Sequence, residues 1–319
     1  MANIRDVAKA ANCSISTVSY VLSGSRKISL GTRERVYKVI EDIGYLPAKT
    51  IRINKNGKTN TIAGLVMGYN SPAMGHVLTA MTERFSQKGY RLLTTTSFDT
   101  VCQMLDESSV DGIIAFDTQL GRELSNYRPI KDIPVCFINN YIEDYNVFNY
   151  IQDNESMFYN VISYLVSKGC KKIAYLSGPA ISYDNNQRMK GYLRACSDNA
   201  ISPEILQGDF NLASGYLAGK GVIASGNNYD AIAAGNDEMA IGLIEAFREH
   251  GVSVPGDILV TGYDDIEFSR YYSPNITTVS VDKAIWGSVI AELIITAING
   301  IEVEPMNFIK GNLVIRESA

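Results

Sequence analysis

Polar side chains that suit a polyhydroxylated ligand stand at the ends of several short apolar runs in this 319-residue chain. The selected positions are Asn70, Ser71, Asn139, Arg188, Asn236 and Asp264. Neutral amides, a carboxylate and an arginine together make paired hydrogen bonds to neighbouring hydroxyl groups. Because ligands of parallel α/β sheets bind at the carboxyl ends of the strands, these residues predict a small-molecule site.

Structural explanations are also possible for three residues at or beside these positions. Asp237 directly precedes a predicted helix, where Asp is a strong N-cap, so we assign Asp237 to capping and leave Asn236 for the ligand. Neighbouring residues of a strand point to opposite faces, so at most one of Asp264 and Asp265 is expected in the site. Arg188 lies in a helical stretch and is equally compatible with a surface ion pair.

A second set of residues is suited to reading DNA. A helix predicted after Ser14 has the outward positions Ile15, Ser16, Ser19 and Tyr20. These side chains are short or flat and carry no charge, which suits contact with base edges in a major groove. A small helical bundle whose outward residues only face water is the alternative.

The distribution of charge favours nucleic-acid binding by one end of the chain. The whole chain carries 29 Lys+Arg and 34 Asp+Glu, a net charge of -5, which by itself argues against a polyanionic partner. Residues 1–60, however, hold 11 basic and 4 acidic residues, whereas residues 61–319 hold 18 basic and 30 acidic residues. Arg26, Lys27, Arg33 and Arg35 flank the second and third predicted helices, where they can contact phosphates.

Three short helices are expected to position the DNA-reading residues. The first begins after Asn3, with Asp6 completing a capping box. The second begins after Ser14, and the third begins near Ser29 and ends at Gly44, a favourable C-terminal residue. Two short helices joined by a tight turn form a helix-turn-helix, here within an all-α headpiece.

From Thr61 onward, short apolar runs alternate with amphipathic stretches, which is typical of a parallel α/β domain. The predicted strands are 62–67, 91–95, 112–116, 134–138, 172–176, 231–234 and 259–263. The predicted helices are 77–88, 155–168, 187–198, 238–250 and 286–299. The strands form two successive sets, which predicts two lobes with a ligand cleft between them. The expected segments are a DNA-binding headpiece at 1–47, a hinge or linker at 48–60, and an effector-binding and dimerisation domain at 61–319.

The motifs of common enzymes are missing from the sequence. Residues 219–224 match a dinucleotide-binding pattern, but they lie in a helical stretch without the preceding strand that such a loop needs. Five scattered cysteines and only two histidines, His76 and His250, give no metal-ligand spacing, so neither a metal nor a cofactor is expected. No apolar run reaches the ~18 residues of a membrane span, and the polar N-terminus does not look like an export signal. We therefore expect a cytoplasmic binding protein without catalytic activity.

The N-terminal stretches 3–22, 32–36 and 44–47 carry a long constrained pattern, Asp6-Val7-Ala8 followed by Ser14, Thr17-Val18-Ser19 and Thr32-Arg33 at fixed distances. This pattern closely resembles the headpiece of the lactose and galactose repressor (LacI/GalR) family. The resemblance implies base contacts by Ile15, Ser16 and Tyr20. It also implies phosphate or base contacts by Ser14, Thr17, Ser19 and Arg26.

The resemblance extends over the rest of the chain. The matching segments are 188–192, 208–210, 234–242, 262–265 and 277–279. It implies a two-lobed α/β effector domain like the periplasmic binding proteins, in which Arg188, Asn236 and Asp264 hold polar groups of an effector. Phe210 would stack on the effector's apolar face, and Asn70, Ser71 and Asn139 would line the first lobe.

The hinge departs from the family pattern. After Pro47 the family continues toward Ala-Arg-Ser-Leu, whose leucine inserts into the minor groove, whereas here Asn54 follows Ile51-Arg52-Ile53. A polar Asn cannot replace an apolar wedge. We expect Ile53 or Ile51 to take over, with Arg52 beside the DNA, or the DNA bend to be smaller. Asn139 also stands where relatives often carry Asp, and 95–110 is shorter than in typical relatives.

These observations predict a sequence-specific transcriptional regulator, a repressor of a carbohydrate-utilisation operon that binds a palindromic DNA operator as a homodimer. A small sugar-type effector would regulate its DNA binding. Phe210 offers a face on which a sugar ring can stack, and the sequence has no basic cluster beyond Arg188 that could bind a phosphate. The apolar helix at 286–298 is expected to provide dimer surface. A purine or sugar-phosphate corepressor is the alternative for the effector, and a cytoplasmic α/β enzyme is the alternative from another class.

Overall fold

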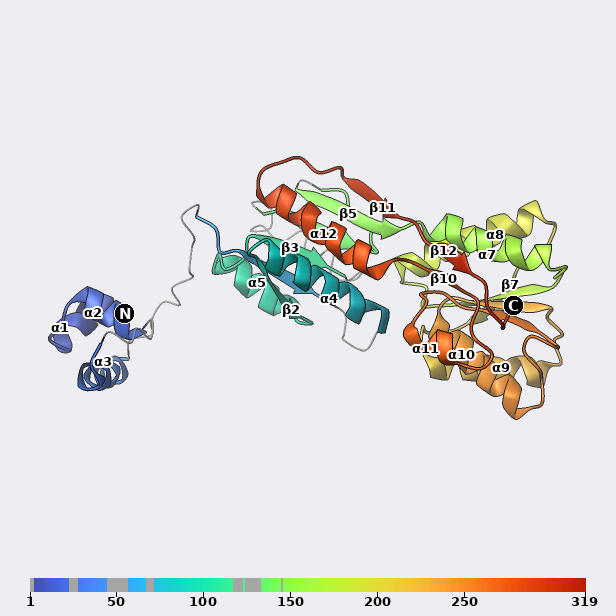
Figure 1. Cartoon of the computed structure of the whole chain (residues 1–319), viewed down its shortest axis with the longest axis horizontal. Helices are drawn as coiled ribbons and strands as arrows, with labels where there is room; N and C mark the ends of the chain where they lie inside the picture. Colours follow the sequence, from blue (N-terminus) through green and yellow to red (C-terminus); the bar gives the residue numbers. More distant parts are fainter. Residues whose placement is uncertain are drawn as a thin grey trace. The chain divides into compact units, whose positions relative to one another are not determined.

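The computed structural model describes residues 3–22, 28–44, 57–66, 72–116, 123, 133–144 and 146–319. The chain divides into two compact units, Met1–Gly57 and Lys58–Ala319 (Figure 1). Several positions selected from the sequence lie outside the described residues, namely Arg26, Lys27, Ile51, Arg52, Ile53, Asn54, Asn70 and Ser71.

The small unit contains three helices in its described part, α1 (Ile4–Ala10), α2 (Ile15–Leu22) and α3 (Leu30–Asp42). The Asn3 side chain accepts hydrogen bonds from the backbone of Arg5 and Asp6, and the Asp6 carboxylate accepts one from the Asn3 backbone. Ser14 Oγ accepts from the Thr17 N–H at 3.0 Å. These caps confirm the predicted helix starts and satisfy backbone groups that helix ends leave unpaired.

One apolar core holds the three helices together. Its buried members are Val7, Ala8, Ala11, Val18, Val21 and Val36. Helices of this length are unstable alone in water, so their stability depends on this shared core. The core fixes which face of α2 points outward.

The large unit contains two parallel sheets and one short antiparallel pair among its described residues. The first sheet has the order β11-β5-β4-β3-β1-β2, with β1 (Thr61–Leu65), β2 (Arg91–Thr95), β3 (Gly112–Ala115), β4 (Val135–Ile138), β5 (Val147–Gln152) and β11 (Met306–Ile309). The second has the order β7-β6-β8-β9, with β6 (Ile173–Ser177), β7 (Glu204–Gln207), β8 (Ala231–Ala234) and β9 (Leu259–Thr261). The antiparallel pair is β10 (Thr278–Ser280) and β12 (Asn312–Val314).

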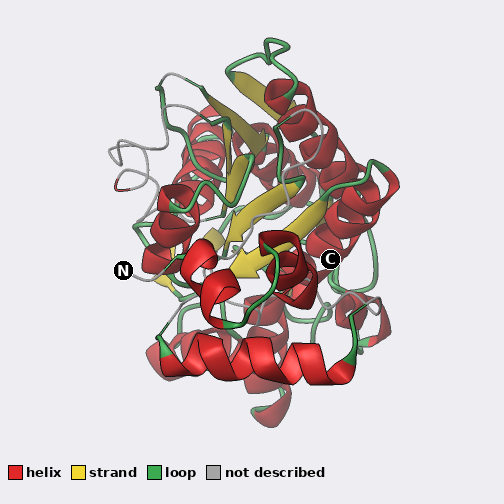
Figure 2. Cartoon of the chain, turned by 90° about the vertical axis from the view of Figure 1, so that its left-hand side faces the viewer, coloured by secondary structure: helices red, strands yellow, loops and turns green. Residues whose placement is uncertain are grey.

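Helices cover the strands of both lobes (Figure 2). Those of the first lobe are α4 (Pro72–Gln87), α5 (Phe98–Asp106) and α12 (Lys283–Ile298). Those of the second lobe are α7 (Asn154–Ser167), α8 (Tyr183–Asp198), α9 (Leu212–Ser225), α10 (Asp237–Glu249) and α11 (Glu267–Tyr271). Along β1, Ile62 and Val66 join the core that includes residues of α4 and α12, while Ala63 and Leu65 join the core that includes residues of α5. Burial of both faces explains the continuous apolar runs of such strands.

The predicted strands form two successive sheets as expected, but this prediction of the sheets did not include the C-terminal part of the chain. After the second sheet the chain returns to the first lobe, where α12 packs beside α4 and β11 pairs with β5 (Figure 1). The residues after β11 then cross back, and the Val260 N–H donates to the Ser318 carbonyl. Three chain segments, rather than one, therefore connect the lobes. These segments lie beside the space between the two lobes.

Close helix packing explains Gly219 in the glycine-rich stretch 219–224. The stretch lies inside α9, as predicted, and not at a strand-to-helix turn. A Cβ atom on Gly219 would lie 2.7 Å from the Cβ of Ala246, and one on Gly242 would lie 2.1 Å from the Leu212 carbonyl oxygen. These glycines allow α9 and α10 to approach each other closely.

Helix α12, which is expected to provide dimer surface, buries one side of its apolar residues within its own lobe. Its buried members are Trp286, Gly287, Ile290, Ala291, Ile294 and Ile295. They pack in the core of their own lobe, and a Cβ on Gly287 would lie 2.5 Å from the Val77 carbonyl oxygen of α4. Ile285 of the same helix is 56% exposed, so the contribution of α12 to a dimer surface stays a prediction.

Candidate functional site

The outward face of α2 exposes the residues predicted to read DNA. Ile15 is 46% exposed and Tyr20 is 52% exposed, while Val18 and Val21 on the opposite face are fully buried. Ser14, Ser16 and Ser19 are exposed as well. Thr17 is half-buried, with its hydroxyl 2.8 Å from that of Ser14. Exposed apolar side chains beside small hydroxyls can contact base edges and thymine methyl groups.

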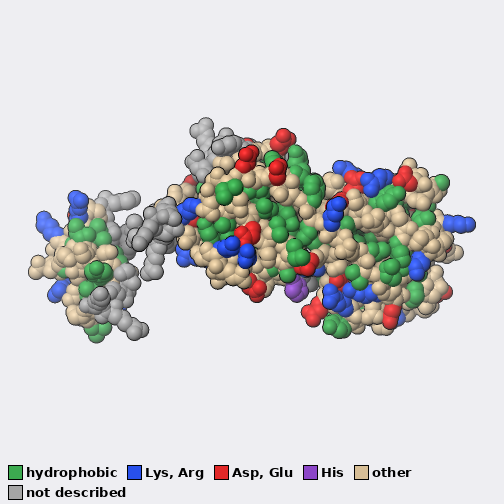
Figure 3. Space-filling model, turned by 45° about the horizontal axis from the view of Figure 1, so that its top comes forward, with side chains coloured by type: hydrophobic (Ala, Val, Ile, Leu, Met, Phe, Trp, Pro, Cys, Tyr) green, Lys and Arg blue, Asp and Glu red, His purple; other side chains and the backbone are tan. Residues whose placement is uncertain are grey.

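Basic side chains are exposed on the same small unit. Arg5, Lys9, Arg35 and Lys38 are exposed, and Arg33 is half-buried on α3. Figure 3 shows Lys and Arg side chains on the surface of this unit. Such side chains position a protein on the phosphate backbone without reading the sequence.

A cavity of about 510 Å³ lies between the two lobes of the large unit. Its lining from the first lobe includes Val66, Phe116, Asn139 and Gln152, which stand at the carboxyl ends of β1, β3, β4 and β5. Its lining from the second lobe includes Asp184, Arg188, Phe210, Asn236, Glu238 and Asp264. The structure thus brings the five described ligand-site predictions, from Asn139 to Asp264, into one cavity.

Arg188 is held rigidly in the wall of this cavity. It is only 3% exposed, so the surface ion-pair explanation is wrong. Its Nε donates to Asn154 Oδ1 at 2.9 Å and its Nη1 donates to the Gly235 carbonyl at 2.5 Å. The guanidinium carbon lies 3.7 Å from the Tyr263 ring centroid, and Nη2 lies 3.8 Å from Asp264 Oδ1. These two hydrogen bonds use two of the five N–H groups, so one on Nη1 and two on Nη2 remain for another partner.

Three carboxylates line the same cavity, and each has a raised pKa. Burial raises the pKa of Asp184 to about 6; Arg188 opposes this shift and Asp264 reinforces it. Burial also raises the pKa of Asp264, against the effect of Arg188 and Lys283. The pKa of Glu238 is raised by burial and by the charge of Asp264. The cavity therefore disfavours its own negative charges.

Three buried polar atoms of the cavity lining have no hydrogen-bond partner among the described residues. They are Asn139 Oδ1, Gln152 Oε1 and Trp286 Nε1. Gln152 is 6% exposed and Trp286 is 4% exposed. Unpaired buried polar groups are costly, so such atoms mark places where a ligand or water makes the missing hydrogen bonds.

Gln152, Trp286 and Asp184 were missed as site residues from the sequence. Gln152 ends β5, a strand that was not predicted, and recognition of that strand would have placed it at the ligand edge. Trp286 is near the start of α12, and only the return of the chain to the first lobe brings it to the cavity. Asp184 sits in the first turn of α8, four residues before Arg188, and that helical spacing was an available signal.

The capping assignment of Asn236 and Asp237 is reversed in the structure. Asn236 is the N-cap of α10, and its Oδ1 accepts from the Met239 N–H at 3.0 Å. Asp237 is fully buried and accepts from Thr278 Oγ1 at 2.6 Å and from the Ile266 N–H at 2.9 Å. Both residue types cap helices well, and the distant partners of Asp237 decide between them. Asn236 still lines the cavity.

Phe210 presents its ring to the cavity from a strained backbone position. Its φ is 56°, and the Asn236 amide donates to its carbonyl at 2.8 Å. A Cβ on Gly178 would lie 2.2 Å from the Phe210 Cζ atom, so the ring lies directly over this glycine. An aromatic face fixed in this way can stack on the apolar side of a ring-shaped ligand.

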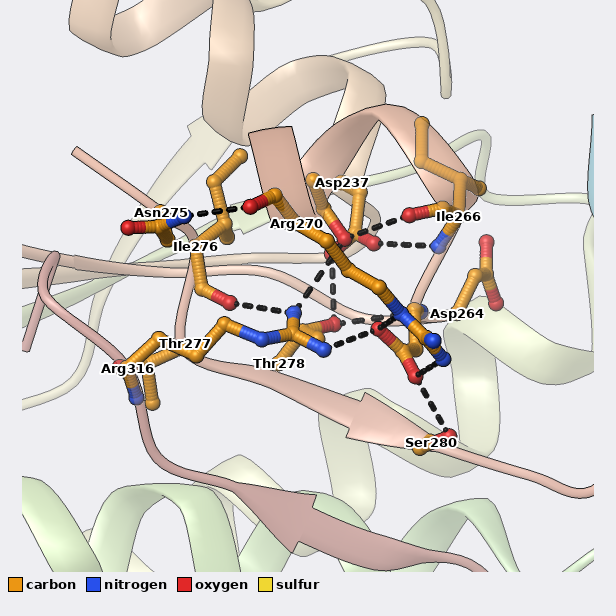
Figure 4. Close-up of polar contacts among 12 residues, drawn as sticks. Asp237, Asp264, Ile266, Arg270, Asn275, Ile276, Thr277, Thr278, Ser280 and Arg316 are labelled. Atoms are coloured by element: carbon orange, nitrogen blue, oxygen red, sulfur yellow. Dashed lines mark hydrogen bonds and ion pairs between the residues drawn. The ribbon is translucent and has the colours of Figure 1, made fainter. Parts of the chain in front are cut away.

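The side chains of Asp264 and Asp265 lie in different surroundings, as expected, but the two residues do not alternate along a strand. Both follow β9 in a turn with positive φ, 103° and 47°. Asp264 lines the cavity, whereas the Asp265 carboxylate accepts from Arg270 at 2.8 Å, Arg316 at 2.5 Å and Ser280 at 2.8 Å. These hydrogen bonds outweigh burial and lower the pKa of Asp265 to about 2. Figure 4 shows how this network joins the segments that pass between the lobes.

Neither a membrane helix nor a metal centre is found in the described part of the chain. Its helices include none with the length and apolar character to cross a membrane. Its His, Cys, Asp and Glu side chains form no group of three or more that could hold a metal ion.

Both units match known protein families. Residues 3–48 match the model described as bacterial regulatory proteins, lacI family, and residues 162–319 match a periplasmic binding protein-like domain. The chain is 32% identical to the HTH-type transcriptional repressor PurR of Photobacterium profundum, over 100% of this chain and 98% of that protein.

Solved structures agree with this assignment. A complex of the transcriptional regulator CelR with cellobiose has a TM-score of 0.76 and 25% identity, covering 100% of both chains. The lac repressor dimer bound to operator and the anti-inducer ONPF has a TM-score of 0.74 and 25% identity, covering 99% of this chain and 98% of that one. The chain belongs to the lacI family of bacterial regulatory proteins and is a DNA-binding transcriptional repressor of that family.

Proposed function

We propose that α2 lies in the major groove of an operator and reads it with Ile15, Ser16 and Tyr20. The support is the exposure of these side chains opposite a fully buried face. Ser14, Thr17, Ser19 and Arg33 contact phosphates from α2 and α3, and Arg26, Arg52 and Ile53 add contacts from segments on either side of α3. Phosphate contacts of this kind make the affinity fall steeply with salt.

The operator is palindromic and the repressor binds it as a homodimer. One headpiece offers few base contacts, and two-fold symmetric half-sites double them. The lac repressor, which is similar over nearly the whole chain, is a dimer on its operator.

The cavity of the large unit binds a small sugar-type effector. The observation that carries this proposal is the set of unpaired polar atoms, Asn139 Oδ1, Gln152 Oε1 and Trp286 Nε1, beside the aromatic ring of Phe210. Hydroxyl groups supply both donors and acceptors for such atoms, and a pyranose has an apolar face for the ring. The similar regulator CelR was solved as a cellobiose complex. Asn70 and Ser71 complete the first-lobe side in this proposal.

Effector binding alters how the two lobes close and so changes DNA affinity. Coupling between two such sites typically amounts to 1–3 kcal/mol and acts in both directions. The role of the cavity is binding and not catalysis, without a cofactor, and the repressor works in the cytoplasm, where bacterial operators lie. A purine or a sugar phosphate acting as corepressor is the alternative effector for the same DNA-binding role.

A deletion and a ligand screen test the proposal. The fragment that lacks residues 1–58 is expected to lose DNA binding and to remain a folded dimer that binds ligand. A screen of sugars, sugar phosphates and nucleobases by thermal shift then identifies the effector class, since a ligand at ~100 times its Kd adds about 2.7 kcal/mol of stability. A stabilising nucleobase without any stabilising sugar would replace the sugar proposal by the purine alternative.

A further inference from the structure

The ionisable side chains of the ligand cavity are unbalanced toward negative charge. Its lining contains three carboxylates, Asp184, Glu238 and Asp264, and two cations, Arg188 and Lys283. The unpaired oxygens of Asn139 and Gln152 add two further acceptors. Among the described residues, the cavity therefore offers more acceptors than donors to a ligand.

Both cations of the lining are already engaged by the protein. Arg188 donates to Asn154 and to the Gly235 carbonyl and stacks on Tyr263. Lys283 Nζ donates to the carbonyl oxygen of Asp264 at 2.5 Å. Each cation thus gives part of its hydrogen-bonding capacity to the protein, and two cations do not outnumber the three carboxylates, which disfavours an incoming phosphate or carboxylate.

The negative charges of the three carboxylates, in contrast, are poorly balanced by ion pairs and hydrogen bonds from the protein. The only ion pair of Asp264 among the described residues is the 3.8 Å contact with Arg188, too long for a hydrogen bond. Asp184 accepts a neutral hydrogen bond from Asn154 at 2.8 Å. No described residue forms a hydrogen bond or ion pair with the Glu238 carboxylate. The charge of Asp264 raises the pKa of both Asp184 and Glu238, so the three groups share one region of the cavity.

We propose that the effector carries a protonated amine that sits among Asp184, Glu238 and Asp264, on a polyhydroxylated ring whose apolar face lies against Phe210. The effector class is then an amino sugar or a related aminated polyol. An ammonium group neutralises the surplus charge and donates up to three hydrogen bonds, and the hydroxyls satisfy Asn139, Gln152 and Trp286. This inference rests on the proposed sugar-type function and narrows it, because it excludes sugar phosphates.

A matched ligand series tests the charge requirement on the full-length chain. The probes are glucosamine, galactosamine and mannosamine, each compared with its neutral parent hexose, its N-acetyl derivative and its 6-phosphate, by thermal shift and calorimetry at pH 6.5. At least one free amine is expected to bind about tenfold or more tightly than all three of its counterparts, the order of difference that a charge-assisted hydrogen bond makes.

Isosteric variants test which carboxylates are responsible. Glu238→Gln and Asp184→Asn are each expected to weaken amine binding about tenfold and to weaken neutral hexose binding much less. Glu249→Gln removes the same charge at the other end of α10, where Glu249 accepts from Tyr216 outside the cavity. It is expected to bind the amine like the wild type, and any variant that does not fold is recognised by its baseline melting curve.

The possible outcomes separate the two proposals. A neutral hexose or a 6-phosphate that binds as well as its free amine overturns the amine inference and leaves the sugar-type function standing. Amine binding that resists both Glu238→Gln and Asp184→Asn overturns the assigned position. The absence of binding by every compound in the series contradicts both the inference and the sugar-type function.

Discussion

The guanidinium carbon of Arg188 lies 3.7 Å from the ring centroid of Tyr263. This contact links α8 to the turn after β9, and the same turn places Asp264 in the cavity and Asp265 in the Arg270 and Arg316 network. Ligand contacts and the segments that pass between the lobes therefore meet within a few residues. A ligand that moves Asp264 acts directly beside the connections that set the closure of the lobes.

Arg188→Lys is expected to lower the free energy of unfolding by about 2 kcal/mol, because a lysine cannot serve both Asn154 and the Gly235 carbonyl and leaves a buried acceptor unpaired. Urea denaturation measures this loss. Arg194→Lys on the same helix, where Arg194 is 46% exposed beside Glu155, is the control and is expected to stay within about 0.5 kcal/mol of the wild type. Equal effects of the two substitutions would contradict the anchoring role of Arg188.

Tyr20→Ala is expected to alter operator preference, and Arg33→Ala is expected to weaken binding to all sequences. Tyr20 projects from the exposed face of α2, so its loss removes discrimination at one or two base pairs, with about tenfold less preference for the selected site. Loss of one phosphate contact at Arg33 lowers the slope of affinity against salt by about one. Binding to selected and mutated operators over a salt series distinguishes the two. A reversed pattern would remove Tyr20 from base reading.

Gly242→Ala is expected to destabilise the chain by about 2 kcal/mol, because its Cβ would lie 2.1 Å from the Leu212 carbonyl oxygen and backbone must move. Gly221→Ala in α9 is the matched control. Its Cβ meets nothing within 4 Å, so the better helix propensity of alanine is expected to add up to about 1 kcal/mol. Thermal or urea unfolding of both variants measures these opposite signs, and a stabilised Gly242→Ala variant would refute the close approach of α9 and α10.

Asp237→Asn is expected to gain stability relative to the wild type as the pH rises. Burial raises the pKa of Asp237 from 3.8 to about 7, against the hydrogen bond from Thr278. The folded chain therefore keeps a proton that the unfolded chain has lost, and this contribution to stability, complete below pH 3.8, disappears as the pH rises to about 7. An amide stays neutral throughout, so the difference in unfolding free energy favours the variant more at pH 8 than at pH 5. Parallel stability curves for the two proteins would show that Asp237 does not titrate in this range.

Local sequence signals predicted the headpiece well and the large unit less completely. Helix caps such as Asn3 and Ser14 bind backbone groups three residues further along the chain, so a short stretch of sequence is enough to predict them. Strands β2 and β8 have the predicted bounds, and β8 is a compact, fully buried apolar run. Strand β5 was missed because polar Asn149 and Gln152 interrupt its apolar pattern, and the pairing of β11 with it depends on contacts about 157 residues apart in the chain.

The cavity residues also differ in whether local sequence patterns or contacts distant in sequence determine their positions. Arg188, Phe210 and Asp264 follow recognisable local patterns, and the structure places all three in the cavity. The roles of Asn236 and Asp237 are decided by Thr278 and Ile266, which are distant in sequence, so local capping preference could not assign them. Trp286 reaches the cavity only because α12 returns to the first lobe, an arrangement that no local pattern encodes.

The most direct test of the account is the operator affinity of the full-length chain with and without ligand. The operator is selected by the chain from random DNA, the ligand is the compound that most raises the melting temperature, and fluorescence anisotropy gives the Kd. A 5- to 150-fold change in operator Kd is expected at saturating ligand. Asp264→Asn is expected to keep the ligand-free Kd and to lose most of this change. An operator Kd that is the same with and without saturating ligand would contradict the coupling of the cavity to DNA binding.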